Sequence, residues 1–196
     1  MGAARWEYRL WQDAPPPLSA GEIEERTDLY LVRPGMTGRM VKLRDGCFDV
    51  KNLIAQADGL QCWQPDPKLP FPLDSGAVAA ALCLDAGERH LLGPRHDCAE
   101  SLVERLERAT RTRVVAVRKR RATQDQRGCT AETAQVRLEG LWYGCHALEH
   151  ADPDRLLAAI DALGWPRCRN ESYIERLGRE PEQGQPATTS SSQCRP

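Results

Sequence analysis

A chain of 196 residues is long enough for one domain with a substantial core, and its 27 basic and 28 acidic residues leave a formal net charge of −1. Binding of nucleic acid through bulk charge is therefore disfavoured, and a site for a polyanion must come from local placement of charges. The sequence contains no apolar run of membrane-spanning length, no charged-then-apolar leader and, among its eight cysteines, no Cys-x-x-Cys pair. We therefore expect a cytoplasmic protein with reduced thiols, no zinc site and no membrane contact.

The first predicted strands alternate charged and apolar residues with the period of two that is typical of β-structure. Residues 6–11 place Glu7 and Arg9 on one face, with Trp6, Tyr8 and Leu10 on the other. Residues 40–44 and 48–52 repeat this pattern. Their charged faces carry Lys42 and Arg44, then Asp49 and Lys51.

Proline-rich connectors at residues 13–17 and 64–72 interrupt the strands. Two helices are predicted after the second connector. Residues 74–84 begin with an Asp-Ser cap and continue into alanines. Residues 97–110 carry Leu102, Val103 and Leu106 on one face. These helices would pack their apolar faces on the strands.

Strand patterns return at residues 114–121, 136–139 and 147–149. In the first of these, either Lys119 and Arg121 or Arg118 and Arg120 share the charged face, because a slip of one residue exchanges the two sets. The charged face of the second carries Arg137 and Glu139, and that of the third carries Glu149.

The C-terminal part predicts a helix and then a tail. Residues 152–164 form a helix with an Asp cap, proline in the first turn and glycine at the end. Residues 178–196 have no aromatic or large aliphatic side chain and predict a disordered tail. We therefore expect one domain over residues 1–177 and a tail over residues 178–196.

Two arrangements explain strands with one charged and one apolar face. In an ordinary antiparallel sheet the apolar faces cover a core and the charged faces meet water. In a closed barrel the charged faces can line the interior, with helices packed on the apolar outside. The charged faces here use Arg, Lys and Glu in pairs two residues apart rather than Thr, Ser or Gln, which favours the barrel.

The order of these elements resembles the CYTH superfamily, the triphosphate tunnel fold of class IV adenylyl cyclases, thiamine triphosphatases and inorganic triphosphatases. The resemblance covers residues 5–177 and ends in Ser172-Tyr173, which looks like the family's C-terminal Ser-Tyr. It implies an α+β fold, a closed antiparallel barrel of about eight strands with helices outside. It also implies phosphate-binding side chains inside the barrel, which in this sequence are Arg9, Lys42, Arg44, Lys51, Lys119, Arg121 and Arg137.

The resemblance further implies catalytic carboxylates that hold Mg²⁺ or Mn²⁺, and the residues in those positions are Glu7, Glu139 and Glu149. A salt bridge to a neighbouring base is the alternative role of each glutamate. The family's Glu-x-Glu-x-Lys strand reads Arg5, Glu7 and Arg9 here, and its later Glu-x-Glu reads Ala147 and Glu149. These departures put a site for two metal ions in doubt.

The resemblance therefore implies a metal-dependent hydrolase of a triphosphate or polyphosphate compound. The alternative is a polyanion-binding protein that has kept the basic tunnel and lost part of the metal site, which the residues at positions 5 and 147 favour. Cyclic nucleotide synthesis would need a base pocket that the sequence does not reveal. The identity of the phosphate compound and the oligomeric state stay open.

Overall fold

The computed structural model describes residues 2–18 and 23–179. The helices are α1 (Ser75–Leu82), α2 (Ala86–Leu92), α3 (Ala99–Ala109), α4 (Pro153–Ala162) and α5 (Tyr173–Leu177). The strands are β1 (Arg5–Gln12), β2 (Glu24–Val32), β3 (Arg39–Arg44), β4 (Cys47–Ala57), β5 (Leu60–Pro65), β6 (Leu69–Pro70), β7 (Leu73–Asp74), β8 (Arg95–His96), β9 (Arg113–Gln126), β10 (Cys129–Leu138) and β11 (Leu141–His150).

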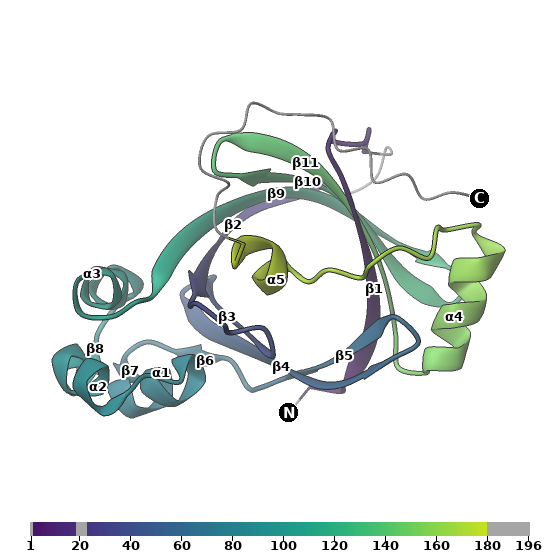
Figure 1. The fold of residues 1–196 in the computed structure, drawn as a ribbon. Coiled ribbons are helices and arrows are strands. Elements are labelled where there is room, and N and C mark those ends of the chain that lie inside the picture. The colour runs from purple at the N-terminus through teal and green to yellow at the C-terminus, as the bar shows by residue number, and fades with distance from the viewer. Residues whose placement is uncertain (1, 19–22, 180–196) are drawn as a thin grey trace.

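The long strands close into a ring. They follow the order β3-β2-β9-β10-β11-β1-β5-β4, all pairs are antiparallel, and a β3–β4 pairing joins the ends. β6 pairs with Cys47 and Phe48 at the start of β4, while β7 and β8 form a separate two-stranded sheet. Figure 1 shows these strands arranged in a ring. The predicted closed antiparallel barrel is confirmed, and it is the architecture that the resemblance to the CYTH superfamily implies.

The apolar strand faces point outward and are covered by helices on two sides (Figure 1). On one side, α1, α2 and α3 pack on outward residues of β3 that include Val41 and Leu43. On the opposite side, α4 packs on Tyr8 of β1 and Leu148 of β11. These contacts bury the outward apolar faces, so charged faces are free to line part of the inside, and the rest of the inside is filled by an apolar cluster that includes Val117 and Val136. The alternative arrangement, an ordinary antiparallel sheet whose charged face meets water, is therefore excluded.

The caps explain where the helices begin. Asp74 and Asp152 accept hydrogen bonds from the first free N–H groups of α1 and α4, which confirms two of the predicted starts. The helix α2 was not predicted; it is short and begins with a capping box between Asp85 and Glu88. The strands β2 and β5 were not predicted either.

Other expectations concern the rest of the chain. Nearly all of the predicted tail, residues 180–196, lies outside the described residues. Within the described ranges, no helix is long and apolar enough to cross a membrane. The thiols of Cys47, Cys62, Cys83, Cys98, Cys129 and Cys145 are free, as expected for a reduced protein. Cys168 departs from that expectation, because it is disulfide-bonded.

Candidate functional site

The inside of the barrel is divided along its length into a charged half and an apolar half. Along β9, the inward residues Arg121 and Lys119 belong to the charged half, and Val117 and Val115 belong to the apolar half. The same division recurs on the other strands. The basic side chains of the charged half are Arg9, Arg26, Lys42, Arg44, Lys51, Lys119 and Arg121, and its acidic side chains are Glu7, Asp28, Asp49, Glu132 and Glu149.

Asp28 on β2 lies at the centre of the charged half and is 0% exposed. Its Oδ2 is 3.2 Å from Nζ of Lys119 and 3.8 Å from Nζ of Lys42, and its Oδ1 is 3.6 Å from Nε of Arg26 and 3.8 Å from Nε of Arg44. Burial raises the pKa of Asp28, but the surrounding cations, Lys119 foremost, outweigh it and hold the pKa below its usual value. One carboxylate therefore faces four cations.

Asp49 and Glu24 supply further negative charge: Asp49 bonds Arg44 at 2.8 Å and lies 3.7 Å from Lys42, and Glu24 bonds Arg26 at 2.8 Å. Bases nevertheless outnumber acids in the charged half. Burial and the neighbouring Lys119 and Arg44 hold the pKa of Lys42 well below its usual value. Burial lowers the pKa of Lys119 to about 8, although Asp28 opposes the shift. In the described part of the chain, the buried Nε atoms of Arg26 and Arg44 have no hydrogen-bond partner, and neither has Oδ1 of Asp28, which lies 3.6 and 3.8 Å from them. Buried donors without partners are costly, and phosphate oxygens are acceptors that would satisfy them.

The wall formed by β1 and β10 holds a second set of ion pairs. Arg9 donates from Nε to Glu7 at 2.9 Å, and its Nη1 lies 3.6 Å from Glu132. Glu132 also accepts from Arg121 at 2.7 Å, and Arg121 bonds Glu24 at the rim. Burial opposes ionisation of Glu132, but Arg9, Lys119 and Arg121 lower its pKa to about 2. Glu7 and Glu132, the buried acids of this wall, are therefore ionised and paired with bases.

Glu7 and Glu149 form a carboxyl pair. They lie directly opposite each other on β1 and β11, and their side chains hydrogen-bond to one another. Burial and the adjacent Glu7 raise the pKa of Glu149 to about 7, whereas Arg9 and Lys51 outweigh burial and lower the pKa of Glu7. The pair therefore shares one proton near neutral pH.

The structure brings most of the predicted site residues together: Glu7, Arg9, Lys42, Arg44, Lys51, Lys119, Arg121 and Glu149. It also decides the register of β9, since Arg118 and Arg120 lie outside and bond Glu25. Two placements were wrong. Arg137 is exposed on the outer face opposite Arg118, and Glu139 is exposed in the β10–β11 turn, paired with Arg113. Both belong to the outward set because Val136 and Leu138 occupy the inward positions.

Sequence reasoning missed the acids Asp28 and Glu132. The alternation of Glu24, Arg26 and Asp28 on β2 is a signal that could have found Asp28. Glu132 lies on an earlier part of β10 whose small residues obscure the strand pattern. In the register, Glu132 is next to Ala147, and Ala147 is next to Arg9. Ala147 lacks a carboxylate, and Arg9 reaches past it to Glu132.

Glu7 and Glu149 are the residues that fit a divalent cation. Mg²⁺ binds through one or two carboxylates together with phosphate oxygens and water, and this pair supplies two carboxyl groups on adjacent strands. Across residues 2–18 and 23–179, no group of three or more His, Cys, Asp or Glu side chains is arranged to hold a metal. The donor set therefore suits one cation completed by a phosphate ligand, and it does not suit a pair of cations.

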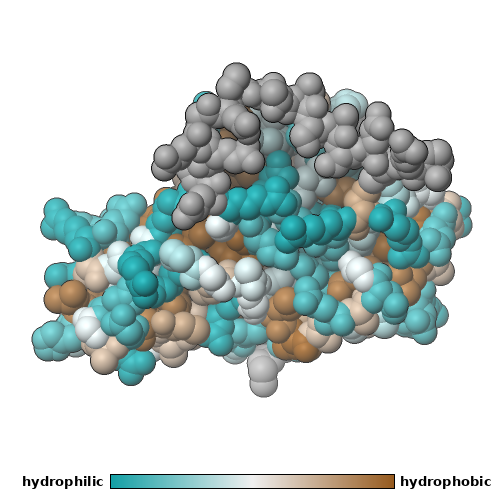
Figure 2. Space-filling model, in the orientation of Figure 1, coloured by the Kyte–Doolittle hydropathy of each residue, from teal (hydrophilic) through white to brown (hydrophobic). Residues whose placement is uncertain are grey.

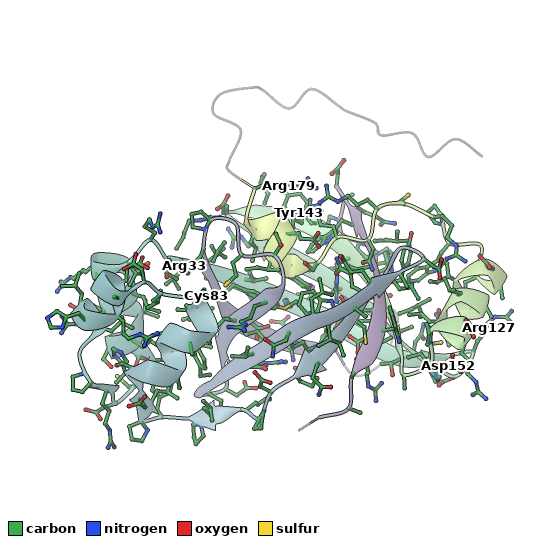
Figure 3. The ribbon with its side chains drawn as sticks, turned by 60° about the horizontal axis from the view of Figure 1, so that its bottom comes forward. Arg33, Cys83, Arg127, Tyr143, Asp152 and Arg179 are labelled. Atoms are coloured by element: carbon green, nitrogen blue, oxygen red, sulfur yellow. The ribbon has the colours of Figure 1, made fainter. Side chains whose placement is uncertain are left out.

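Helix α5 closes one end of the barrel. Ser172 is its N-cap, and the buried Tyr173 points inward, where the centroid of its ring lies 3.8 Å from Nζ of Lys119 and 4.7 Å from Cζ of Arg9. The ring also stacks on Tyr30 at 5.5 Å and meets Trp11 edge-on at 4.9 Å. These aromatic rings form the boundary between the charged and apolar halves. In Figure 3, Tyr143 and Arg179 are labelled beside this helix.

No protein-family model and no curated protein matches the chain. Among solved structures, a conserved hypothetical protein from Pyrococcus furiosus aligns with a TM-score of 0.49 and 15% identity, over 86% of this chain and 98% of that chain. HpAC1 from Hippeastrum, described as a candidate adenylyl cyclase with a dominant triphosphatase activity, gives 0.47 and 9%, over 91% of this chain and 98% of that one. A protein from Pyrococcus horikoshii OT3 gives 0.47 and 15%, over 86% and 98%. These alignments carry no argument about activity.

Proposed function

We propose that this chain is a divergent CYTH protein that binds a linear triphosphate or polyphosphate in the charged half of its barrel. The observation that carries the proposal is the surplus of buried bases around Asp28, including the Nε donors of Arg26 and Arg44, which lie near Asp28 but make no hydrogen bond. The guanidinium fork matches phosphate oxygens, and a confined group of cations favours a polyanion over a single charge.

We further propose that the bound chain is hydrolysed. Water would attack the terminal phosphorus, the adjacent P–O bond would break, and tripolyphosphate would give orthophosphate and pyrophosphate. Lys42, Lys119 and Arg121 would hold the phosphate oxygens, and Glu7 and Glu149 would hold one Mg²⁺ or Mn²⁺. Such a cation neutralises charge that develops on the phosphoryl group.

Binding without hydrolysis is the second candidate. It is favoured by Ala147, which leaves the carboxyl pair without a third acid, and by Arg9, whose Nε bonds Glu7 and would compete with a cation. If the lost acids explain a low activity, the double variant Arg5→Glu with Ala147→Glu should increase metal-dependent turnover.

The test is phosphate release from tripolyphosphate with Mg²⁺ or Mn²⁺, and with a chelator in parallel. Hydrolysis predicts metal-dependent release that Glu149→Ala abolishes and that Glu139→Ala, on the outer face, retains. Binding by calorimetry without release would support the second candidate. A folded protein that neither binds nor cleaves tripolyphosphate would refute both.

A further inference from the structure

Two hollows adjoin at the β10–β11 turn, outside the barrel. One, of about 570 Å³, lies on the outer wall of β9 and β10, and the other, of about 290 Å³, lies between the turn and α5. Arg113 and Glu139, which form an ion pair, line both hollows. We call the two hollows together the arginine groove, because five of the lining residues are arginines: Arg113, Arg118, Arg137, Arg176 and Arg179.

Small residues leave the outer wall hollow at this place. Ala116 on β9 and Gly140 in the turn line the larger hollow, and Val114 with Ala116 gives it an apolar floor. In Figure 1, β9 and β10 run between the two groups of helices that cover the flanks of the barrel. Arg118 and Arg137 on this wall are exposed.

A row of outward side chains crosses the wall. Arg118 on β9 pairs with Thr27 on β2 and with Arg137 on β10, and Trp142 on β11 follows in the same row. Two like charges are therefore directly opposite each other on adjacent strands, which is unfavourable without a counter-charge. Glu25 bonds Arg118 at 3.3 Å. Within residues 2–18 and 23–179, the guanidinium of Arg137 has neither an ion pair nor a hydrogen bond.

The second hollow continues the basic surface beyond the turn. Its lining includes Arg176 and Arg179, which share the carboxylate of Glu171, and the exposed Leu141. Three carboxylates thus serve the five arginines of the groove: Glu25, Glu139 and Glu171. On the described part of the face that carries α5, hydrophobic residues are scattered among hydrophilic ones (Figure 2). The arginine groove therefore combines surplus positive charge with small apolar areas.

We propose that the arginine groove binds an acidic, extended segment of a partner protein. The guanidinium fork binds a carboxylate through two parallel hydrogen bonds, so acidic side chains would lie on Arg118 and Arg137 while an apolar side chain lies on the floor between strands. The ion pair of Glu139 with Arg113 shows that a protein carboxylate fits this groove. A nucleic acid is a poorer match, because the net charge of −1 provides no long-range attraction for a polyanion.

The first experiment measures fluorescence anisotropy with the full chain and a labelled, capped peptide in which glutamates alternate with serine and leucine. The proposal predicts that this peptide binds at least about tenfold more tightly than the same peptide with glutamine in place of glutamate. Equal affinity of the two peptides, or no binding of the glutamate peptide at about 1 mM, would overturn the proposal. Tighter binding of a short oligothymidylate, lost in Arg137→Gln, would assign the groove to nucleic acid and also overturn it.

Variants place the peptide on the protein. The double variant Arg118→Gln with Arg137→Gln should weaken binding of the glutamate peptide at least about tenfold. Arg155→Gln, at an exposed position on α4, should leave it unchanged. Both groove arginines are exposed, so the double variant should stay folded, which denaturant unfolding checks. Unchanged peptide binding in the folded double variant would overturn the proposal.

The groove and the charged half of the barrel share no residue, so the two proposals fail separately. The double variant Arg118→Gln with Arg137→Gln should bind tripolyphosphate as the wild type does, measured by calorimetry. Loss of peptide binding in Arg121→Gln, which changes an inward side chain, would place the peptide inside the barrel and overturn the groove. A protein that binds the glutamate peptide but no tripolyphosphate would refute the proposed function and leave the groove in place.

Discussion

At the scale of single residues, the buried charges stabilise one another only as a set. Asp28 is the clearest case, because it is wholly buried and is the carboxylate shared by Lys42, Lys119, Arg26 and Arg44. Buried ion pairs contribute little beyond an apolar alternative, yet removal of one partner leaves the other charges uncompensated. The stability of the empty barrel therefore depends on this one side chain more than its size suggests.

The variant Asp28→Asn should lower the free energy of unfolding by about 3–5 kcal/mol, because the four cations lose their common counter-charge. Denaturant titration measures the effect, and Asp97→Asn, at an exposed position, should change stability by less than about 0.5 kcal/mol. Tripolyphosphate should restore part of the loss in Asp28→Asn. Equal stability of the two variants would contradict the central role of Asp28.

The carboxyl pair makes stability depend on pH in a direction opposite to that of the other buried acids. The folded protein holds a proton on Glu149 with a pKa of about 7, against 4.5 as the ordinary value. Between these pH values the folded state binds more protons than the unfolded state, so this contribution is complete below about pH 4.5 and is lost as pH rises through 7.

In the metal-free protein, Glu149→Gln should therefore gain stability relative to the wild type as pH rises from about 5 to 8. The gain arises because the variant has no proton to lose, and it can reach about 3 kcal/mol. Thermal or denaturant unfolding across this range, in the presence of chelator, measures the difference. Parallel pH profiles for the two proteins would contradict a shared proton.

At the scale of elements, the segment before α5 takes the place of a strand. β1 pairs with β5 only from Arg5 to Glu7, and beyond that point Asn170 bonds the free backbone groups of β1. The ring is thus completed by a side chain where the two strands separate. This arrangement also fixes where Tyr173 enters the barrel.

The variant Asn170→Ala should lower the free energy of unfolding by about 1–3 kcal/mol, because a buried N–H and a buried carbonyl of β1 lose their partners. Its neighbour Arg169 is 70% exposed, and Arg169→Ala should change stability by less than about 0.5 kcal/mol. Chemical denaturation of both variants is the measurement. A smaller loss in Asn170→Ala than in Arg169→Ala would show that water replaces the amide without cost.

At the scale of the whole molecule, the net charge of −1 conceals a strongly uneven distribution. Bases outnumber acids inside the barrel, so the empty interior carries a repulsion that a bound polyanion would relieve. Binding to the folded state alone raises stability through linkage, by about 2.7 kcal/mol at a ligand concentration of 100 times Kd.

Tripolyphosphate should therefore raise the Tm of the wild-type protein, and much less that of Arg121→Gln. The shift should decrease with added salt, since the rim charges are screened over distances of about 8–10 Å. Differential scanning calorimetry at two ionic strengths measures both effects. A shift of the same size in Arg121→Gln would place the stabilising contact elsewhere.

The sequence alone was sufficient for the features that depend on local spacing. Alternation with a period of two located the strands that carry Glu7, Lys42 and Lys119, and caps located α1 and α4, because both signals are contained within a few adjacent residues. The ambiguity at residues 114–121 could not be resolved in this way, since both faces of that strand carry arginine or lysine.

Only the tertiary structure decided which charges meet. Asp28 and Lys119 are 91 residues apart in the sequence and 3.2 Å apart in space, and no local pattern indicates such a pairing. Arg137 and Glu139 have the same alternation as inward residues, yet the register of β10 with β9 and β11 turns them outward. The closed end likewise depends on α5 packing into the ring. Strand register and helix docking are set by burial of apolar faces across the whole molecule. For that reason the sequence predicted the kind of site, whereas the tertiary structure determined which residues form it.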